Sequence, residues 1–218
     1  MRIRVKFAKT AHMKYTGHLD LYRTIERTIR RANLPLSYSQ GFNPKPKITL
    51  ASALPLGYTS DCELVDIWLD EDMDLLEIAK SFKQASPPGI QLLEMDSVEE
   101  RAPKLQNVMQ ASAFTVTLLE DVPSLEKRVA ELNAQDSLLR ERKRKGKIKN
   151  YDLRPLIEEL AVLPNDEEDH QRLHMRLTAL PGATGRPDEV LEVLNIDPYT
   201  VKTHRAAIIL ADAPIPQS

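Results

Sequence analysis

The stretch with the clearest chemistry is residues 41–47, where a glycine is followed by an aromatic ring, two prolines and two lysines. The glycine permits backbone conformations that other residues resist. Pro44 and Pro46 fix their own φ and favour extended geometry in the residue before each. The segment is therefore predicted to be stiff and to present Lys45 and Lys47 as a pair. Cations beside aromatic rings on a rigid loop suit a phosphate chain whose bases can stack. The alternative is a proline-stiffened lead into a strand, with both lysines merely solvated.

Positive charge is concentrated in two parts of a chain of 218 residues whose net charge is only −2. Residues 1–50 carry 11 lysines and arginines against 2 acidic residues, whereas residues 51–100 carry 2 lysines against 12 acidic residues. Residues 140–149 form a second basic block, with 7 cations in 10 positions. Because like charges repel, this block is predicted to be an extended, mobile loop. The isoelectric point near 6.2 argues against a general nucleic-acid coat and permits one basic and one acidic face.

Hydrophobic periodicity predicts the same order of elements twice. In the first half it predicts strands at residues 3–7, 48–56, 63–69 and 90–95, with helices at 17–32 and 72–82. This βαββαβ order is the ferredoxin-like signature. The second half repeats the order, with a proline opening its second helix. The predicted fold class is therefore α+β, with two tandem ferredoxin-like domains at residues 1–97 and 111–213, a linker at 98–110 and the basic loop 140–149 inside the second domain.

The first strand alternates apolar residues with Arg2, Arg4 and Lys6, so one of its faces is cationic. In a ferredoxin-like sheet the helices cover one face and leave the other open. An open cationic face can bind nucleic acid, as other sheets of this kind do. Two alternatives are an ion-pair ladder with Asp66 on the third strand, and coverage of this face by the other domain.

The first helix carries an arginine stripe on the side opposite its apolar residues. Most such stripes are solvated, but this one is followed within a short loop by the lysine pair. We predict that the two basic blocks hold phosphates and that one of two aromatic rings stacks a base. The residues predicted to bind nucleic acid are Arg23, Arg27, Arg30, Arg31, Tyr38, Phe42, Asn43, Lys45, Lys47, Arg142, Lys143, Arg144, Lys145, Lys147, Lys149 and Arg154. Arg154 has two further interpretations, pairing with Asp152 or anchoring the basic loop.

Catalytic and metal sites have little support in the sequence. His18, at the start of the first helix, is a candidate for a general acid or base acting on an RNA 2′-hydroxyl, and the alternative is a hydrogen bond to the loop at Ser39 or Asn43. His170 and His174 are four apart, a spacing that converges on one metal only on a helix, and they are predicted to lie near a strand. Cys62 is the only cysteine. We therefore expect no metal and no cofactor.

The chain is expected to be cytoplasmic and not to contact a membrane. No apolar run approaches the roughly 20 residues of a membrane helix. The N-terminus alternates apolar and cationic residues, which is not the pattern of a signal peptide. A single cysteine excludes an internal disulfide and fits a reducing compartment.

Several motifs resemble the radical-SAM-linked protein family, a bacterial domain family of unknown function. In the first half they are residues 17–20, 30–35, 38–48 and 53–57, and in the second half residues 142–147, 152–157 and 186–191. Where the family pattern has Ser-His-Leu-Asp, this chain has Gly17 before His18. The resemblance implies a companion of a cobalamin-binding-type radical SAM protein, fused to it or encoded beside it. With one cysteine, this chain cannot itself hold the iron–sulfur cluster of such an enzyme.

Charge and resemblance together predict a non-catalytic RNA-binding accessory module. It is expected to present structured RNA, tRNA or rRNA, to a radical SAM modification enzyme. One alternative is a metal-independent endoribonuclease with His18 as general base, an analogy from the fold alone. A second is a protein–protein adaptor that docks the radical SAM partner through the acidic residues 61–77.

Overall fold

The computed structural model describes residues 1–144 and 147–211, and within these the side chains of all but residues 142–144, 147 and 149. The chain divides into two compact units. Unit 1 comprises Met1–Met109 with the chain from Leu210, and unit 2 comprises Gln110–Ile209. Both units combine antiparallel strands with α-helices, so the fold class is α+β.

Unit 1 contains strands in the order β4-β1-β3-β2. β1 pairs antiparallel with both β3 and β4, and β2 pairs antiparallel with β3. Its elements are β1 (Arg2–Lys9), η1 (Ala11–Met13), α1 (His18–Arg31), β2 (Ile48–Leu50), β3 (Thr59–Trp68), α2 (Leu75–Ala85), β4 (Ile90–Val98) and α3 (Leu105–Val108).

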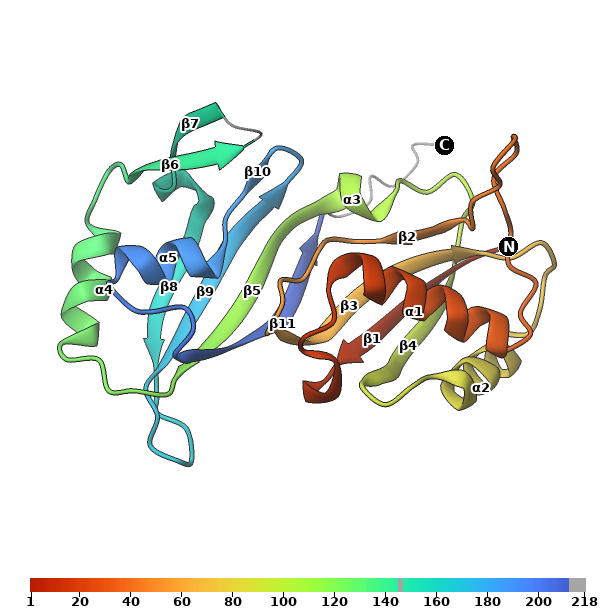
Figure 1. The fold of residues 1–218 in the computed structure, drawn as a ribbon, viewed down its shortest axis with the longest axis horizontal. Helices are drawn as coiled ribbons and strands as arrows, with labels where there is room; N and C mark the ends of the chain where they lie inside the picture. Colours follow the sequence, from red (N-terminus) through yellow and green to blue (C-terminus); the bar gives the residue numbers. More distant parts are fainter. Residues whose placement is uncertain (145–146, 212–218) are drawn as a thin grey trace. The chain divides into compact units, whose positions relative to one another are not determined.

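The two long helices of unit 1 lie on the same side of its sheet (Figure 1). Their apolar stripes meet the inward residues of β1 and β3 in one buried core, which supplies the hydrophobic stabilisation of this unit. The most buried members of this core are Ile3, Val5, Phe7, Leu21, Ile25, Ile29, Val65, Ile67, Ile78 and Phe82.

Helix α1 begins and ends where the sequence predicts. Gly17 is its N-cap, and Asp20 in the first turn complements the positive end of the helix dipole. At the other end Asn33 takes a left-handed conformation with φ 54°, which asparagine tolerates better than most residues. The backbone N–H of Leu34 then donates to the carbonyl of Ile29 at 3.2 Å and closes the last turn.

Two predicted elements of unit 1 differ from the structure. β2 is shorter than the predicted strand 48–56, because the chain turns at Pro55, whose carbonyl accepts from the N–H of Tyr58, and at Gly57, which has φ 85°. The segment predicted as a linker contains the short helix α3, and Leu105 in it is fully buried. Apolar burial therefore makes this segment part of unit 1.

Unit 2 repeats the order of unit 1 once the β6–β7 hairpin and the short β10 are set aside. β9 pairs with β5, β8 and β10, and β11 lies next to β5, so the strand order β8-β9-β5-β11 corresponds to β2-β3-β1-β4 of unit 1. Its elements are β5 (Met109–Leu118), α4 (Leu125–Asn133), β6 (Leu139–Arg144), β7 (Lys147–Asp152), η2 (Arg154–Leu156), β8 (Ile157–Leu163), β9 (Arg172–Leu180), β10 (Ala183–Thr184), α5 (Pro187–Val193) and β11 (Val201–Leu210).

The described residues of the basic block, 140–144 and 147–149, lie in the paired strands β6 and β7. β6 and β7 pair over six positions, and Arg142 lies opposite Lys149. The base of the hairpin is closed by Asp152, whose Oδ1 accepts from the backbone N–H of Leu138 at 2.7 Å and of Arg154 at 2.9 Å.

We predict that Asp152→Ala loosens this hairpin. The two N–H groups bound to the carboxylate hold the pKa of Asp152 below its usual range, with the N–H of Leu138 contributing most. Because the folded-state pKa is depressed, the stabilisation is present above the ordinary carboxyl range and is lost as the pH falls through the folded pKa. Hydrogen exchange at Leu138 and Arg154 should become roughly tenfold faster in the variant. Asp136→Ala, an exposed change nearby, should leave both rates unaltered, and equal rates in the two variants would contradict the assignment.

Candidate functional site

The segment predicted to be stiff is the tip of a narrow backbone hairpin. Ser39 and Lys45 are joined twice: the N–H of Ser39 donates to the carbonyl of Lys45 at 2.8 Å, and the N–H of Lys45 donates to the Ser39 hydroxyl at 2.9 Å. The N–H of Lys47 donates to the carbonyl of Ser37 at 2.8 Å. Gly41, with φ 132°, lies at the turn, in a conformation that disfavours any side chain. Extended backbone places the two lysine side chains on the same side, about 7 Å apart.

This hairpin is attached to α1 through aromatic residues. The hydroxyl of Tyr22 on α1 donates to the carbonyl of Pro46, between the two lysines, at 3.2 Å. Burial raises the pKa of Tyr22, with smaller contributions from Glu26 and Tyr38, so the phenol keeps the proton that it donates. The Arg30 guanidinium lies 5.9 Å from the centre of the Tyr38 ring. The lysine pair is therefore fixed beside the helix that carries the arginines.

We call this region the α1–loop surface. It consists of the four arginines of α1, both lysines, and the two residues at the tip of the hairpin. Its members are Arg23, Arg27, Arg30, Arg31, Phe42, Asn43, Lys45 and Lys47, and all eight are exposed.

The cations of the α1–loop surface fall into two groups. Arg23 pairs with Asp20 at 3.4 Å and Arg30 pairs with Glu26 at 2.8 Å, both along the helix. The others, Arg27, Arg31, Lys45 and Lys47, make no ion pair in residues 1–144 and 147–211. Solvent-exposed helical pairs contribute little stability, so the paired arginines can exchange their partner for a phosphate at small cost.

The two aromatic residues predicted to stack a base differ in accessibility. Phe42 projects from the tip and its side chain is fully exposed. Tyr38 is only partly exposed, and Arg30 lies over its ring. Phe42 is therefore the more accessible of the two rings, and the Tyr38 ring is partly covered by Arg30.

The face of β1 that carries the cations is not an open platform. Arg2 has only 1% of its surface exposed, and its guanidinium contacts Asp66 at 2.5 Å. Asp66 is fully buried and also accepts from Arg4 at 2.8 Å and 3.1 Å, because the two residues lie directly opposite in the β1–β3 register. Lys6 pairs with Glu94 at 2.7 Å. The structure therefore confirms the ion-pair ladder, and the open cationic platform predicted for this face is absent.

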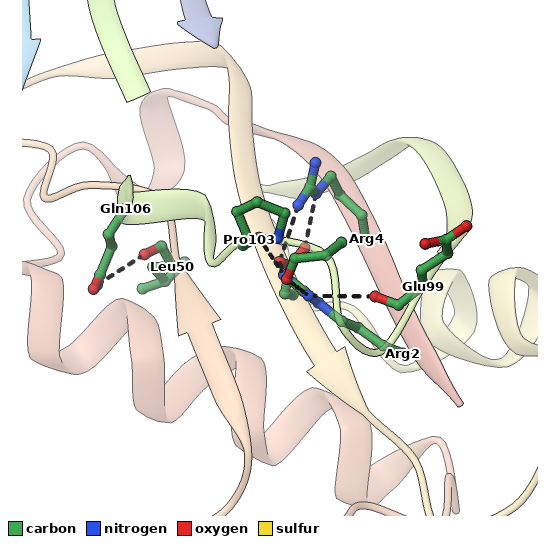
Figure 2. A network of polar contacts seen from close by, with 8 residues as sticks. Arg2, Arg4, Leu50, Glu99, Pro103 and Gln106 are labelled. Atoms are coloured by element: carbon green, nitrogen blue, oxygen red, sulfur yellow. Dashed lines mark hydrogen bonds and ion pairs between the residues drawn. The ribbon is translucent and has the colours of Figure 1, made fainter. Parts of the chain in front are cut away.

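Three backbone carbonyls of the segment after β4 complete the Arg2 site. The guanidinium donates to the carbonyls of Ala102 at 2.6 Å, Pro103 at 2.9 Å and Glu99 at 3.4 Å (Figure 2). A few residues further on, the Gln106 amide donates to a carbonyl of β2 at 3.3 Å. These contacts fasten the segment after β4 over the buried charges.

Of the unit 2 cations predicted to bind nucleic acid, the structure describes only the side chain of Arg154. Lys145 lies outside the described residues, as do the side chains of Arg142, Lys143, Arg144, Lys147 and Lys149. Arg154 has a structural role: its guanidinium donates to the carbonyls of Ile157, Gln135 and Asn133 at 2.9, 3.0 and 3.4 Å. It anchors the chain after the hairpin to the end of α4, with one hydrogen bond from each of its three nitrogens.

The histidines show no catalytic arrangement. His18 begins α1, and its buried Nδ1 has no hydrogen-bond partner within the described part of the chain. His170 lies against Asp166 at 3.2 Å, and His174 lies 3.4 Å from Glu159. Across residues 1–144 and 147–211 there is no group of three potential metal-binding side chains, and no helix there is long and apolar enough to cross a membrane.

One feature of unit 1 has no signal in the sequence. An open groove of about 440 Å³ runs beside α1 and is lined by Met13, Thr24, Arg27, Arg30, Arg31 and Pro87. Met13 and Pro87 are distant in the chain, and the fold brings both next to the arginines. Neither residue type suggests a binding site by itself, so the groove is recognisable only in the folded chain.

Comparison with known proteins assigns the chain to a family. Residues 2–187 match the model of a family described as "Uncharacterized protein conserved in bacteria (DUF2344)", so the chain belongs to this family. A search of curated proteins finds no match. The chain is similar to one chain of the "Crystal Structure of a Cbf5-Nop10-Gar1 Complex", with a TM-score of 0.49 and 9% identity. The alignment covers 94% of this chain and 48% of the other, so this chain spans about half of that length.

Proposed function

We propose that this protein is a non-catalytic RNA-binding module and that the α1–loop surface holds the phosphates of a structured RNA. The observation that carries the proposal is the set of four exposed cations without an ion pair in the described residues, on a helix and a hairpin fastened together. Cations that lack carboxylate partners are free to neutralise phosphates and release condensed counterions. Phe42 at the tip adds a surface on which a base can stack.

RNA is favoured over an acidic protein by the combination of features. Binding an acidic protein would require only the cations. The fully exposed ring of Phe42 would add nothing to such binding, whereas it can stack on an RNA base. The overall net charge of −2 is also low for a chain that coats nucleic acid, which favours recognition by one local surface.

The proposal has two further parts. We infer that both units are ferredoxin-like, a view supported by their common βαββαβ order and by the strand order β4-β1-β3-β2 with its counterpart in unit 2. We also propose that the RNA is tRNA or rRNA presented to a radical SAM modification enzyme. The support for that partner is the motif resemblance in residues 17–57 and 142–191.

A salt titration tests RNA binding. We expect the affinity for tRNA or an rRNA fragment, measured by filter binding, to fall steeply and linearly on a log–log scale between about 50 and 200 mM salt. A flat dependence would contradict the proposal. Incubating labelled RNA with the protein in EDTA adds a second readout: intact RNA is expected, whereas cleavage that His18→Ala abolishes would favour the endoribonuclease.

A further inference from the structure

The groove beside α1 has one apolar wall and one cationic wall. The apolar wall is formed by Met13, at the end of η1, and by Pro87, just before β4. The cationic wall is formed by arginines of α1, with Thr24 beside them. All of these residues belong to unit 1, whose helices share one side of the sheet (Figure 1).

Met13 is held in place by the turn before β4. The N–H of Thr10 donates to the carbonyl of Gly89 at 3.0 Å, and the N–H of Met13 donates to the carbonyl of Thr10 at 3.0 Å. Gly89 has φ 97°, and a Cβ there would lie 2.5 Å from Cγ of Met13. Gly89 is therefore required for two reasons: its backbone is left-handed, and a side chain there would clash with Met13. The apolar wall is a built feature and not a side chain loose in solvent.

Arg27 and Arg31 lie one helical turn apart on the cationic wall, and neither makes an ion pair within the described chain. Nε of Arg31 donates to the backbone carbonyl of Arg27 at 3.4 Å, which directs the Arg31 side chain back along the helix toward Arg27. The Thr24 hydroxyl donates to the carbonyl of Asp20 at 2.8 Å, so its lone pairs remain available to accept. The acidic residues nearest along α1, Asp20 and Glu26, are engaged by Arg23 and Arg30.

We propose that this groove binds one nucleotide, with its phosphate between Arg27 and Arg31 and its base against Met13 and Pro87. Paired guanidinium groups match the oxygens of a phosphate, and a flat ring fits an apolar wall. A volume of about 440 Å³ lies in the range of pockets for single small ligands. The inference rests on the proposed function in one respect, that the nucleotide is taken to belong to the bound RNA.

The test observes Met13 directly by NMR of the full chain with ¹³C-labelled methionine methyl groups. The chain has six methionines, and Met13→Leu assigns the signal. Titration with AMP, GMP, CMP and UMP is expected to shift the Met13 methyl signal saturably. Adenosine, ribose 5-phosphate and inorganic phosphate should each bind at least tenfold more weakly, because each lacks one half of the recognised group. Arg27→Gln with Arg31→Gln should weaken the response at least tenfold, whereas Arg101→Gln with Lys104→Gln, which removes two exposed cations outside the groove, should leave it unchanged.

Failure of this inference can be told apart from failure of the proposed function. If no mononucleotide moves the Met13 signal up to about 10 mM, the inference is overturned, even where RNA binds with a steep salt dependence. If a polyglutamate peptide moves the signal and mononucleotides do not, the groove binds an acidic protein segment and the inference is again overturned. If mononucleotides bind and structured RNA does not, the groove is a site for free nucleotides and the proposed function fails instead.

Discussion

Neutralising the four free cations of the α1–loop surface should nearly abolish RNA binding. The variant carries Arg27→Gln, Arg31→Gln, Lys45→Gln and Lys47→Gln. If the two arginines share one phosphate and each lysine holds another, three contacts are lost. At about tenfold for each charge-assisted contact, affinity should fall on the order of 10³-fold. The slope of log affinity against log salt should flatten by about 2 to 3, since each phosphate contact contributes roughly 0.7 to 0.9.

A matched control keeps this result specific. Arg101→Gln with Lys104→Gln removes two exposed cations from the segment after β4, which covers the face of the unit 1 sheet opposite the helices. We expect less than a threefold change in affinity and circular dichroism spectra like the wild type for both variants. If the variant with four substitutions still binds RNA, or if the control weakens binding equally, the α1–loop surface is not the RNA-binding site.

The largest effect on stability is expected from Asp66→Asn. This change leaves Arg2, which has 1% of its surface exposed, in the protein interior without a countercharge. Breaking a buried ion pair by removing one partner costs about 3–5 kcal/mol, a large fraction of the total stability of a domain. Unfolding by urea, followed by circular dichroism, should show a midpoint well below that of the wild type.

The ion pair between Lys6 on β1 and Glu94 on β4 is a more exposed pair with which the effect of Asp66→Asn can be compared. Lys6 and Glu94 are 35% and 61% exposed, so Glu94→Gln should cost less than about 1 kcal/mol. Similar losses in Glu94→Gln and Asp66→Asn would show that burial does not set the strength of this ladder. A loss in Asp66→Asn accompanied by faster proteolysis after Val98 would show in addition that Arg2 fastens the following segment.

Local patterns in the sequence predict most of the elements. The spacing of Leu21, Ile25 and Ile29 predicts α1, and Pro187 correctly marks the start of α5, because helical periodicity and capping are local properties. The length of β2 and the packing of residues 98–108 depend on contacts with other elements, which no local window contains.

The candidate site is only partly predictable for the same reason. The sequence places Lys45 and Lys47 on a stiff extended segment, and the structure shows the hydrogen bonds that hold it to α1. Charge alone cannot separate Arg2, which is buried against Asp66, from Arg27, which is exposed and unpaired in the described chain. That distinction depends on which carboxylate lies opposite in the sheet. The wall that Met13 and Pro87 form beside the arginines likewise exists only in the folded chain.

Photo-crosslinking of the protein to its RNA in cells, followed by mass spectrometry of the crosslinked peptides, tests the central claim most directly. We expect crosslinks within residues 38–47, with Phe42 as the main site, because its ring is the fully exposed aromatic group of the α1–loop surface. The same sample, sequenced, identifies the RNA. Crosslinks confined to peptides outside α1 and residues 38–47, or no crosslinked RNA at all, would contradict the account.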